Sequence, residues 1–305
     1  MYRRLTTAAA CLLACLFGLT AAAEPFRLAV LPDTQWAVEN WPHLVTAMTE
    51  WIVKNRDAQN IKYVLHVGDM VQVGDAEEEW KRFRQSMSLL DGKVPYVLTL
   101  GNHDYGKAPA TRGSALFEKY FPPERFARVA SLPTSEQDHG NSYRTFTAGG
   151  IDWLIVAMPF LPGDMLLEGA DRVVAANPNR RVIVLTHSYL THTGRDKSGE
   201  RIWKKLVHKH GNISMVLCGH LSTVHFVSQG NRGNKVYEML FDWQNDVKPD
   251  FNSYFAILTI DPEAARISVK SYAPHLDKYL TDPRAQFEFQ DVDFLKARKQ
   301  MKAAR

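Results

Sequence analysis

Residues 94–104, Val-Pro-Tyr-Val-Leu-Thr-Leu-Gly-Asn-His-Asp, hold a short apolar strand that runs directly into polar side chains. Gly101 lets the backbone turn sharply where the strand ends. Asn102, His103 and Asp104 follow it at once, and they bring an amide, an imidazole and a carboxylate, which are common ligands of metal ions. The stretch therefore predicts a strand whose carboxyl end carries candidate metal-binding or catalytic side chains.

The same pattern occurs at four other predicted strands. Strand 26–32 runs into Asp33-Thr34-Gln35, strand 63–67 into Gly68-Asp69, strand 181–186 into His187, and strand 213–218 into Gly219-His220. Each segment alone is weak evidence, because an Asp after a strand often only caps a turn and a single His is often structural. In an open α/β sheet, however, ligands bind at the carboxyl ends of the strands. Five such segments together predict one metal-binding site.

The order of elements indicates the fold class. Between the first three strands, apolar residues recur at spacings of three and four, which predicts helices around 44–52 and 80–90. This β-α-β-α-β order favours parallel strands with helical crossovers. Residues 142–158 instead predict two strands about a Gly149-Gly150 turn, and the chain after 220 is mostly strands. We therefore expect a single α/β domain with mixed sheets.

Length and composition exclude a disordered or fibrous chain. The chain has 305 residues, 45% hydrophobic and 23% charged, which is average for soluble globular proteins. The net charge is +4, but seven cations lie in the first four and last ten residues, and subtracting them leaves −3 for residues 24–295. A body of that charge has no overall attraction to nucleic acid, and no nucleic-acid-binding surface is evident in the sequence.

The first 23 residues have the pattern of a secretory signal peptide. Arg3 and Arg4 precede an apolar run over 8–19, and three alanines stand before Glu24. The run is shorter than the ~20 residues that a transmembrane helix needs, and no later stretch is as long. We expect an exported protein, periplasmic or secreted, with a domain over 24–290 and a basic tail over 291–305. The alternative is a lipoprotein anchored through Cys15, since Leu-Leu-Ala-Cys at 12–15 resembles a lipobox.

The strand-end residues resemble the motifs of the calcineurin-like metallophosphoesterases. Their pattern is D-x-H, G-D, G-N-H-D/E, a single His and G-H-x-H, and similar motifs occur here in that order across about 28–222. The block at 101–104, with Gly68-Asp69 about thirty residues before it, is the most specific part. The chain looks closest to an exported bacterial branch with D-T-Q in place of D-x-H. The resemblance implies a layered sandwich of two mixed β-sheets flanked by helices.

The resemblance also implies a role for each site residue. Two divalent cations would be bridged by Asp69. The first would be bound by Asp33, Gln35 and Asp69, and the second by Asp69, Asn102, His187 and His220. His103 would act as the general acid or stabilise the leaving oxygen, with Asp104 orienting its ring.

Two departures from the family pattern fall on the first metal site. Gln35 replaces an imidazole, and Ser222 stands where G-H-x-H has its second His. The remaining oxygen ligands suit Mn²⁺, Mg²⁺ or Fe, whereas the second site keeps two His and suits Zn²⁺ or Mn²⁺. His225 could compensate for Ser222, although on a strand the two side chains would point to opposite faces.

These observations predict a hydrolase, an exported metal-dependent phosphoesterase (phosphatase) with two divalent ions, most simply Mn²⁺, and Fe, Zn²⁺ or Mg²⁺ as alternatives. A metal-bound hydroxide would attack a small-molecule or polymeric phosphomonoester or phosphodiester. Two alternatives stay open: a degenerate member that binds a phosphorylated or cell-wall ligand without turnover, and a non-catalytic binding module with structural His and Asp residues. The sequence indicates no protein partner.

Overall fold

A computed structural model describes residues 23–106, 115–126, 141–244 and 249–294. Nearly all of the predicted signal peptide, the alternative lipid anchor at Cys15 and the basic residues of the tail lie outside the described residues. Within the described part of the chain, no helix is long and apolar enough to cross a membrane.

The chain forms two mixed β-sheets, the first of which holds the predicted N-terminal strands. This sheet, which we call sheet A, runs in the order β14 (Lys278–Leu280), β13 (Arg266–Ala273), β12 (Phe255–Asp261), β1 (Phe26–Leu31), β2 (Ile61–His66) and β3 (Tyr96–Leu98), and β15 (Gln286–Phe289) also pairs with β13. The first three strands are parallel, as predicted, whereas β12 is antiparallel to β1 with Ala29 opposite Ile257.

Sheet B contains the middle of the chain. Its order is β10 (Val224–Gln229), β11 (Lys235–Leu240), β9 (Ile213–Cys218), β6 (Arg181–Leu185), β5 (Ile151–Ala157) and β4 (Ser142–Ala148). The four central strands are parallel, while β4 and β10 are antiparallel edges. The β4–β5 hairpin turns at Gly149 and Gly150, as predicted, and both have positive φ. A separate hairpin joins β7 (Leu190–Thr191) and β8 (Gly194–Arg195).

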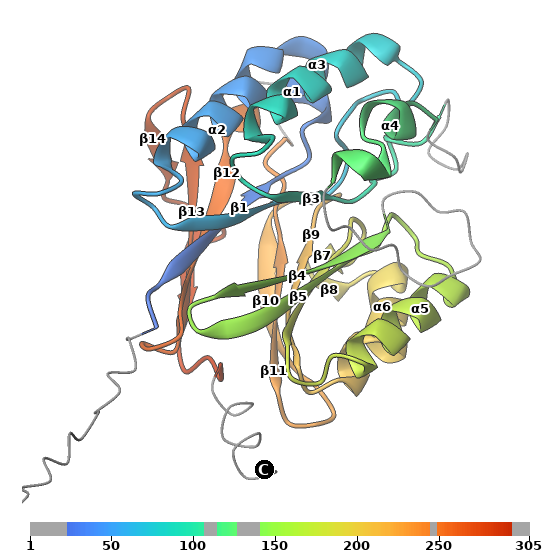
Figure 1. The fold of residues 1–305 in the computed structure, drawn as a ribbon, viewed down its shortest axis with the longest axis vertical. Coiled ribbons are helices and arrows are strands. Elements are labelled where there is room, and N and C mark those ends of the chain that lie inside the picture. Colours follow the sequence, from blue (N-terminus) through green and yellow to red (C-terminus); the bar gives the residue numbers. More distant parts are fainter. Residues whose placement is uncertain (1–22, 107–114, 127–140, 245–248, 295–305) are drawn as a thin grey trace, which may run out of the picture.

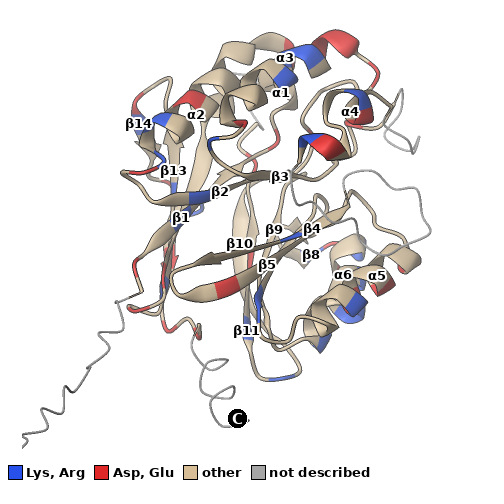
Figure 2. Ribbon diagram, in the orientation of Figure 1, with Lys and Arg blue, Asp and Glu red and all other residues tan. Residues whose placement is uncertain are grey.

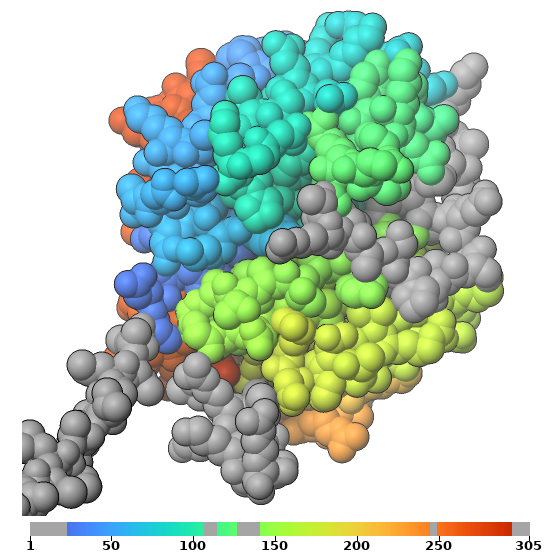
Figure 3. Space-filling view, viewed as in Figure 1, coloured from blue at the N-terminus to red at the C-terminus, as the bar shows by residue number. Residues whose placement is uncertain are grey.

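Helices cover the outer faces of both sheets (Figure 1). On sheet A these are α1 (Gln35–Asn40), α2 (Pro42–Asn55), α3 (Glu77–Met87) and α4 (Ala115–Tyr120), and on sheet B they are α5 (Asp164–Ala175) and α6 (Lys197–Lys205). Figure 3 shows the blue and teal residues of the first half packed above the lime and yellow residues of sheet B and its helices. The predicted layered α/β sandwich is confirmed.

The core between the sheets holds them face to face. Leu28 and Leu65 of sheet A and Ile183 and Met215 of sheet B are fully buried in one apolar cluster. Burying such side chains stabilises a fold by about 1.5–3 kcal/mol each. One difference from the expected helices is small: Leu90, at the end of the helix expected around 80–90, lies in a 3-10 helix after α3.

The domain limits stay a prediction. The packed part of the chain extends past the predicted limit at residue 290, because Val292 and Phe294 are buried in the core between the sheets.

Candidate metal centre

The carboxyl ends of the parallel strands of both sheets meet on one side of the sandwich. Loops after β1, β2 and β3 of sheet A face loops after β6, β9 and β11 of sheet B. Asp69, His187 and His220 each offer one potential ligand atom, and these three atoms lie within 4.8 Å of one another. Residues from three separate strands therefore form one candidate metal site, as their positions after the strands indicated.

Asp69 lies at the middle of this cluster. Its Oδ2 lies 3.2 Å from His187 Nε2, and its Oδ1 accepts a hydrogen bond of 2.8 Å from the backbone N–H of His103. Burial favours a higher pKa, but the neighbouring His187 and His103 hold the pKa of Asp69 below its ordinary value. The carboxylate is thus kept ionised, as a metal ligand must be.

The loop before Asp69 requires glycine at position 68. Gly68 has φ of +103°, and a Cβ there would lie 2.8 Å from the backbone nitrogen of Gly101 and 2.7 Å from His187 Nδ1. A side chain would therefore separate loops that must touch.

The His187 ring presents a nitrogen lone pair to two oxygens. Its Nδ1 lies 2.9 Å from the carbonyl oxygen of Val67, so Nδ1 must carry the hydrogen. In the neutral ring, Nε2 then has no hydrogen, yet it lies 3.2 Å from Asp69 Oδ2 and 3.1 Å from Asn102 Oδ1. Acceptors face one another in this way when a proton or a metal cation lies among them. Burial opposes protonation, but the charge of Asp69 outweighs it and raises the pKa of His187.

His220 faces His187 with ring centroids 5.0 Å apart. Burial, and then the charge of His187, lower the pKa of His220 to about 4, so this imidazole is neutral and able to bind a cation. Its backbone is in the left-handed region, with φ of +81°. Such a conformation is uncommon for a residue with a Cβ and is found preferentially at functional sites.

Asp33 contributes a buried carboxylate oxygen that lacks a hydrogen-bond partner. Its Oδ2 accepts from the backbone N–H of His220 at 2.9 Å, whereas Oδ1 has no partner among the described residues. Leaving a buried anion oxygen unpaired costs free energy. Burial, then the charges of Asp242 and Asp69, raise the pKa of Asp33. A bound cation would pair with the free Oδ1 of Asp33 and would offset the repulsion between Asp33 and the other two carboxylates.

Gln35 lies beside Asp69 at the start of α1. The oxygen of its carboxamide is the atom placed 3.2 Å from Asp69 Oδ2; rotating the amide would put the NH₂ there and satisfy both groups. A cation between the two oxygens would satisfy them without that rotation. Asp33, Gln35 and Asp69 are the residues predicted for the first metal site, and all three are buried. They follow the neighbouring strands β1 and β2.

The contacts of His103 and Asp104 involve mainly the backbone. Its Nδ1 lies 2.8 Å from the carbonyl oxygen of Gln72. The carboxylate of Asp104 accepts hydrogen bonds from the backbone N–H groups of Gly101, Met70 and Val71, at 2.8, 2.8 and 3.2 Å. The Gln72 carbonyl therefore orients the ring, and Asp104 ties the 101–104 loop to the loop after β2. Burial, then the charge of Asp69, raise the pKa of Asp104 to about 8.

Sequence reasoning missed one buried acid. Asp242 is 4% exposed and follows β11 at the same edge of sheet B. Its Oδ1 accepts from the backbone N–H of Gln244 at 2.8 Å, and the Gln244 amide lies 3.2 Å from that of Gln35. Burial raises the pKa of Asp242 to about 7. The strand-end rule could have found this residue, because Asp242 stands two positions after the end of β11.

Two other histidines are placed away from the ligand cluster. His66 is fully buried, and its ring nitrogens contact Thr34 Oγ1 and the backbone N–H of Gly68. His225 stacks on Phe287 with ring centroids 3.7 Å apart. The structure therefore gives His225 an aromatic contact in sheet A rather than a place beside Asp69.

The comparisons with known proteins show the family. Residues 26–222 match the family described as "Calcineurin-like phosphoesterase", so the chain belongs to the family that its motifs resemble. Family membership supports a metal-dependent phosphoester hydrolase. The acceptor-rich cluster of Asp33, Asp69 and His187 fits divalent cations.

Two individual proteins are similar to this chain. "Uncharacterized protein YvnB" of Bacillus subtilis (strain 168) is 30% identical over 264 residues, which cover 84% of this chain and 20% of that protein. The chain thus spans about a fifth of the length of that relative. The purple acid phosphatase PPD1 of yellow lupin seeds has 14% identity, a TM-score of 0.58 and coverage of 90% of this chain and 55% of that chain. At this identity the likeness shows the fold alone.

Proposed function

We propose that this chain is an exported hydrolase that cleaves a phosphomonoester or phosphodiester with two divalent cations, most simply Mn²⁺. The observation that carries the proposal is the cluster of Asp69 and His187, where the ring nitrogen Nε2 lies 3.1 and 3.2 Å from two oxygens. Its place in a calcineurin-like phosphoesterase domain supports the reaction class.

The residues divide between two cation sites as follows: Asp33, Gln35 and Asp69 would hold the first, and Asp69, Asn102, His187 and His220 the second. When bound, such cations lower the pKa of water and neutralise the negative charge that develops on the phosphoryl oxygens.

His103 would protonate the leaving oxygen. The Gln72 carbonyl, 2.8 Å from Nδ1, keeps a hydrogen on that atom and leaves Nε2 to exchange a proton with the substrate. As the oxygen of water joins phosphorus and the water releases a proton to solvent, the P–O bond to the alcohol breaks and His103 gives its proton to the alcohol oxygen. The hydrogen bond from the His103 backbone N–H to Asp69 fixes the position of His103, the proposed general acid, relative to the metal ligands.

The test is metal analysis of the purified protein together with hydrolysis of p-nitrophenyl phosphate and bis(p-nitrophenyl) phosphate. Both are measured on one preparation with added Mn²⁺, Zn²⁺ or Mg²⁺. We expect about two metal ions per chain and turnover of at least one ester. Protein that binds no metal ion would contradict the proposal.

A second candidate function is binding of a phosphorylated ligand without turnover. The observation that favours it is the replacement of two imidazoles by Gln35 and Ser222 in the first site. Protein that binds metal and inorganic phosphate but hydrolyses neither ester would support this candidate.

Export rests on the sequence of residues 1–23. We propose cleavage before Glu24, which the intact mass of protein recovered from periplasm or medium measures. A diacylated species beginning at Cys15 would instead show the lipoprotein.

A further inference from the structure

Exposed apolar side chains are concentrated at the edge of the sandwich that holds the candidate site. In the described part of the chain, the exposed large hydrophobic residues are Val73, Leu161, Met165, Leu221, Val227, Phe251 and Tyr279. The first four and Phe251 lie on loops or helix starts at the carboxyl ends of β2, β5, β9 and β1. Single exposed apolar side chains are ordinary, whereas several of them gathered at one edge indicate a binding surface.

Leu161 and Leu221 each follow, in the sequence, a residue of the candidate site or one that packs on it. Leu221 follows His220 directly and is 37% exposed. Leu161 is 43% exposed and follows Phe160, whose ring centroid lies 5.4 Å from that of His220 and 5.9 Å from that of His187. Leu161 also has φ of +50°, a conformation that costs free energy for a residue with a Cβ. The loop that carries Leu161 therefore lies beside the proposed metal ligands.

The other three residues extend the apolar surface around the site. Val73 is 43% exposed and follows Gln72, whose carbonyl contacts the ring of His103. Met165 lies in the first turn of α5, after Leu161. Phe251 is 38% exposed and precedes β12, which begins where the antiparallel β1 ends. We call these five residues the apolar rim.

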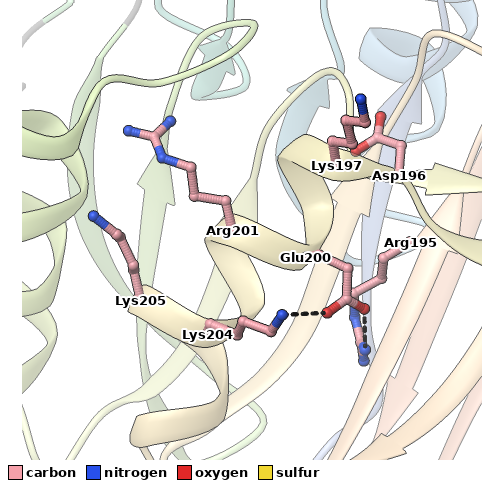
Figure 4. A pocket seen from close by; sticks show the side chains of 7 residues that line it. All are labelled: Arg195, Asp196, Lys197, Glu200, Arg201, Lys204 and Lys205. Atoms are coloured by element: carbon pink, nitrogen blue, oxygen red, sulfur yellow. Dashed lines mark hydrogen bonds and ion pairs between the residues drawn. The ribbon is translucent and has the colours of Figure 1, made fainter.

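Four of the described loops around the candidate site carry no cationic side chain. Residues 70–76, 101–106, 159–164 and 219–223 contain no Lys or Arg. Basic residues are concentrated on α6 (Figure 2). Its Lys204 and the preceding Arg195 are joined to Glu200 (Figure 4), and Lys205 Nζ lies 2.7 Å from Asp164. Within these four described loops, a second anionic group has no Lys or Arg side chain to pair with.

We propose that the substrate is a phosphoester of an apolar alcohol, with an alkyl or aryl group, and that the apolar rim binds that group. The inference rests on the proposed phosphoesterase function, because it takes the position of the phosphoryl group from the metal ligands. A phosphoryl group held between Asp69 and His103 places the rest of the substrate against the residues that surround these two. The alcohol is the part of the substrate that remains outside the metal cluster.

The experiment compares two non-hydrolysable probes that differ only in their apolar group. Methylphosphonate and hexylphosphonate are titrated calorimetrically into the full Mn²⁺-loaded protein. Burying about half of the five additional CH₂ groups predicts roughly 30-fold tighter binding of hexylphosphonate. Binding is measured without turnover, so the result does not depend on catalysis.

The double variant Leu161→Ser/Leu221→Ser tests the rim itself. It should reduce the preference for hexylphosphonate to less than about fivefold and leave the affinity for methylphosphonate unchanged, because it removes apolar contacts only. Val227→Ser is the matched control: Val227 is 50% exposed but lies on β10, which runs away from the site edge. This control should keep the wild-type preference.

The outcomes separate the inference from the proposed function. If neither phosphonate binds the metal-loaded protein, the proposed phosphoryl site is wrong. If both bind equally well, the phosphoryl site stands and the apolar-alcohol inference is overturned. A double variant with a lower thermal unfolding temperature or an altered oligomeric mass would show instead that the rim packs against this chain or a second copy, which also overturns the inference.

Discussion

At the residue scale, the two proposed metal sites differ in what a single substitution removes. Asp69→Asn removes a negatively charged ligand from both cations, because this carboxylate lies beside ligands of both sites. Gln35→Ala takes only a neutral amide from the first site. We therefore expect Asp69→Asn to lose at least one metal and all turnover, whereas excess Mn²⁺ restores much of the Gln35→Ala activity.

Metal content and steady-state kinetics on the same preparations measure this difference. Wild-type turnover by Asp69→Asn would remove the bridging role. A Gln35→Ala protein that stays inactive at every Mn²⁺ concentration would show that the amide does more than bind metal.

His103 gives the second prediction. Its ring is held by the Gln72 carbonyl and is not assigned to a metal. His103→Ala should therefore keep its metals while kcat falls by roughly 10²–10⁴. The loss should be smaller for aryl phosphates, whose leaving groups need little protonation. His192→Ala, which changes an exposed histidine, is the control, and metal loss by His103→Ala alone would contradict the assignment.

The strand-end rule predicted where the site residues lie but not their individual contacts. Asp33, Asp69, Asn102, His187 and His220 each follow a strand, and strand geometry brings them together. The partner of His103 could not be predicted in this way, because the acceptor is the main-chain carbonyl of Gln72. Every residue has a main-chain carbonyl, so no residue type in the sequence identifies the one that accepts this hydrogen bond.

At the element scale, glycines set how closely the loops approach. A Cβ at Gly219 would lie 2.0 Å from Asp33 Oδ1 and 2.8 Å from Val67 Cγ2. Gly219→Ala should therefore displace Asp33 and weaken metal binding by at least about tenfold. Gly106→Ala is the matched control, since a Cβ there meets nothing within 4 Å. Calorimetric Mn²⁺ titration measures both, and equal affinities would show that the loop after β9 adjusts freely.

Strand β2 carries a buried histidine that links stability to pH. Burial, then the charge of His187, lower the pKa of His66 to about 3, whereas an unfolded histidine has a pKa of about 6.5. Below pH 6.5 the unfolded chain gains a proton that the native state does not, so the free energy of unfolding falls as pH falls.

The variant His66→Gln lacks this proton uptake. The difference in the free energy of unfolding between wild type and His66→Gln should shift by about 2 kcal/mol against the wild type between pH 7 and pH 5. Urea denaturation at both pH values measures it. A difference independent of pH would mean that His66 takes up a proton in the native state.

Element types were more predictable than their pairing. Periodicity located α2, α3 and the parallel strands, since buried faces repeat at fixed spacings. The short β14 and β15 gave no such signal, because β14 is largely exposed and only Phe289 of β15 is buried. The pairing of β12 with β1 joins residues more than 200 positions apart, and no local pattern encodes it.

At the scale of the whole molecule, the proposed metal centre joins the two sheets. Asp33, Gln35, Asp69 and Asn102 follow strands of sheet A, whereas His187 and His220 follow strands of sheet B. Cations held between these groups would connect the sheets at one edge of the core and neutralise carboxylates that otherwise repel. The metals should therefore stabilise the fold as well as supply the reaction.

Removal of the metals tests this coupling. At a free Mn²⁺ concentration of 100 times Kd, one binding site adds about 2.7 kcal/mol to the free energy of unfolding. For a domain of this size, each kcal/mol shifts Tm by about 2–4 °C, so EDTA should lower Tm by roughly 5–10 °C and Mn²⁺ should restore it. Asp69→Asn should show little of this shift, because the variant lacks the bridge, whereas Val227→Ser should show all of it. If EDTA leaves the Tm of metal-loaded protein unchanged, the ligands from sheets A and B do not share bound cations.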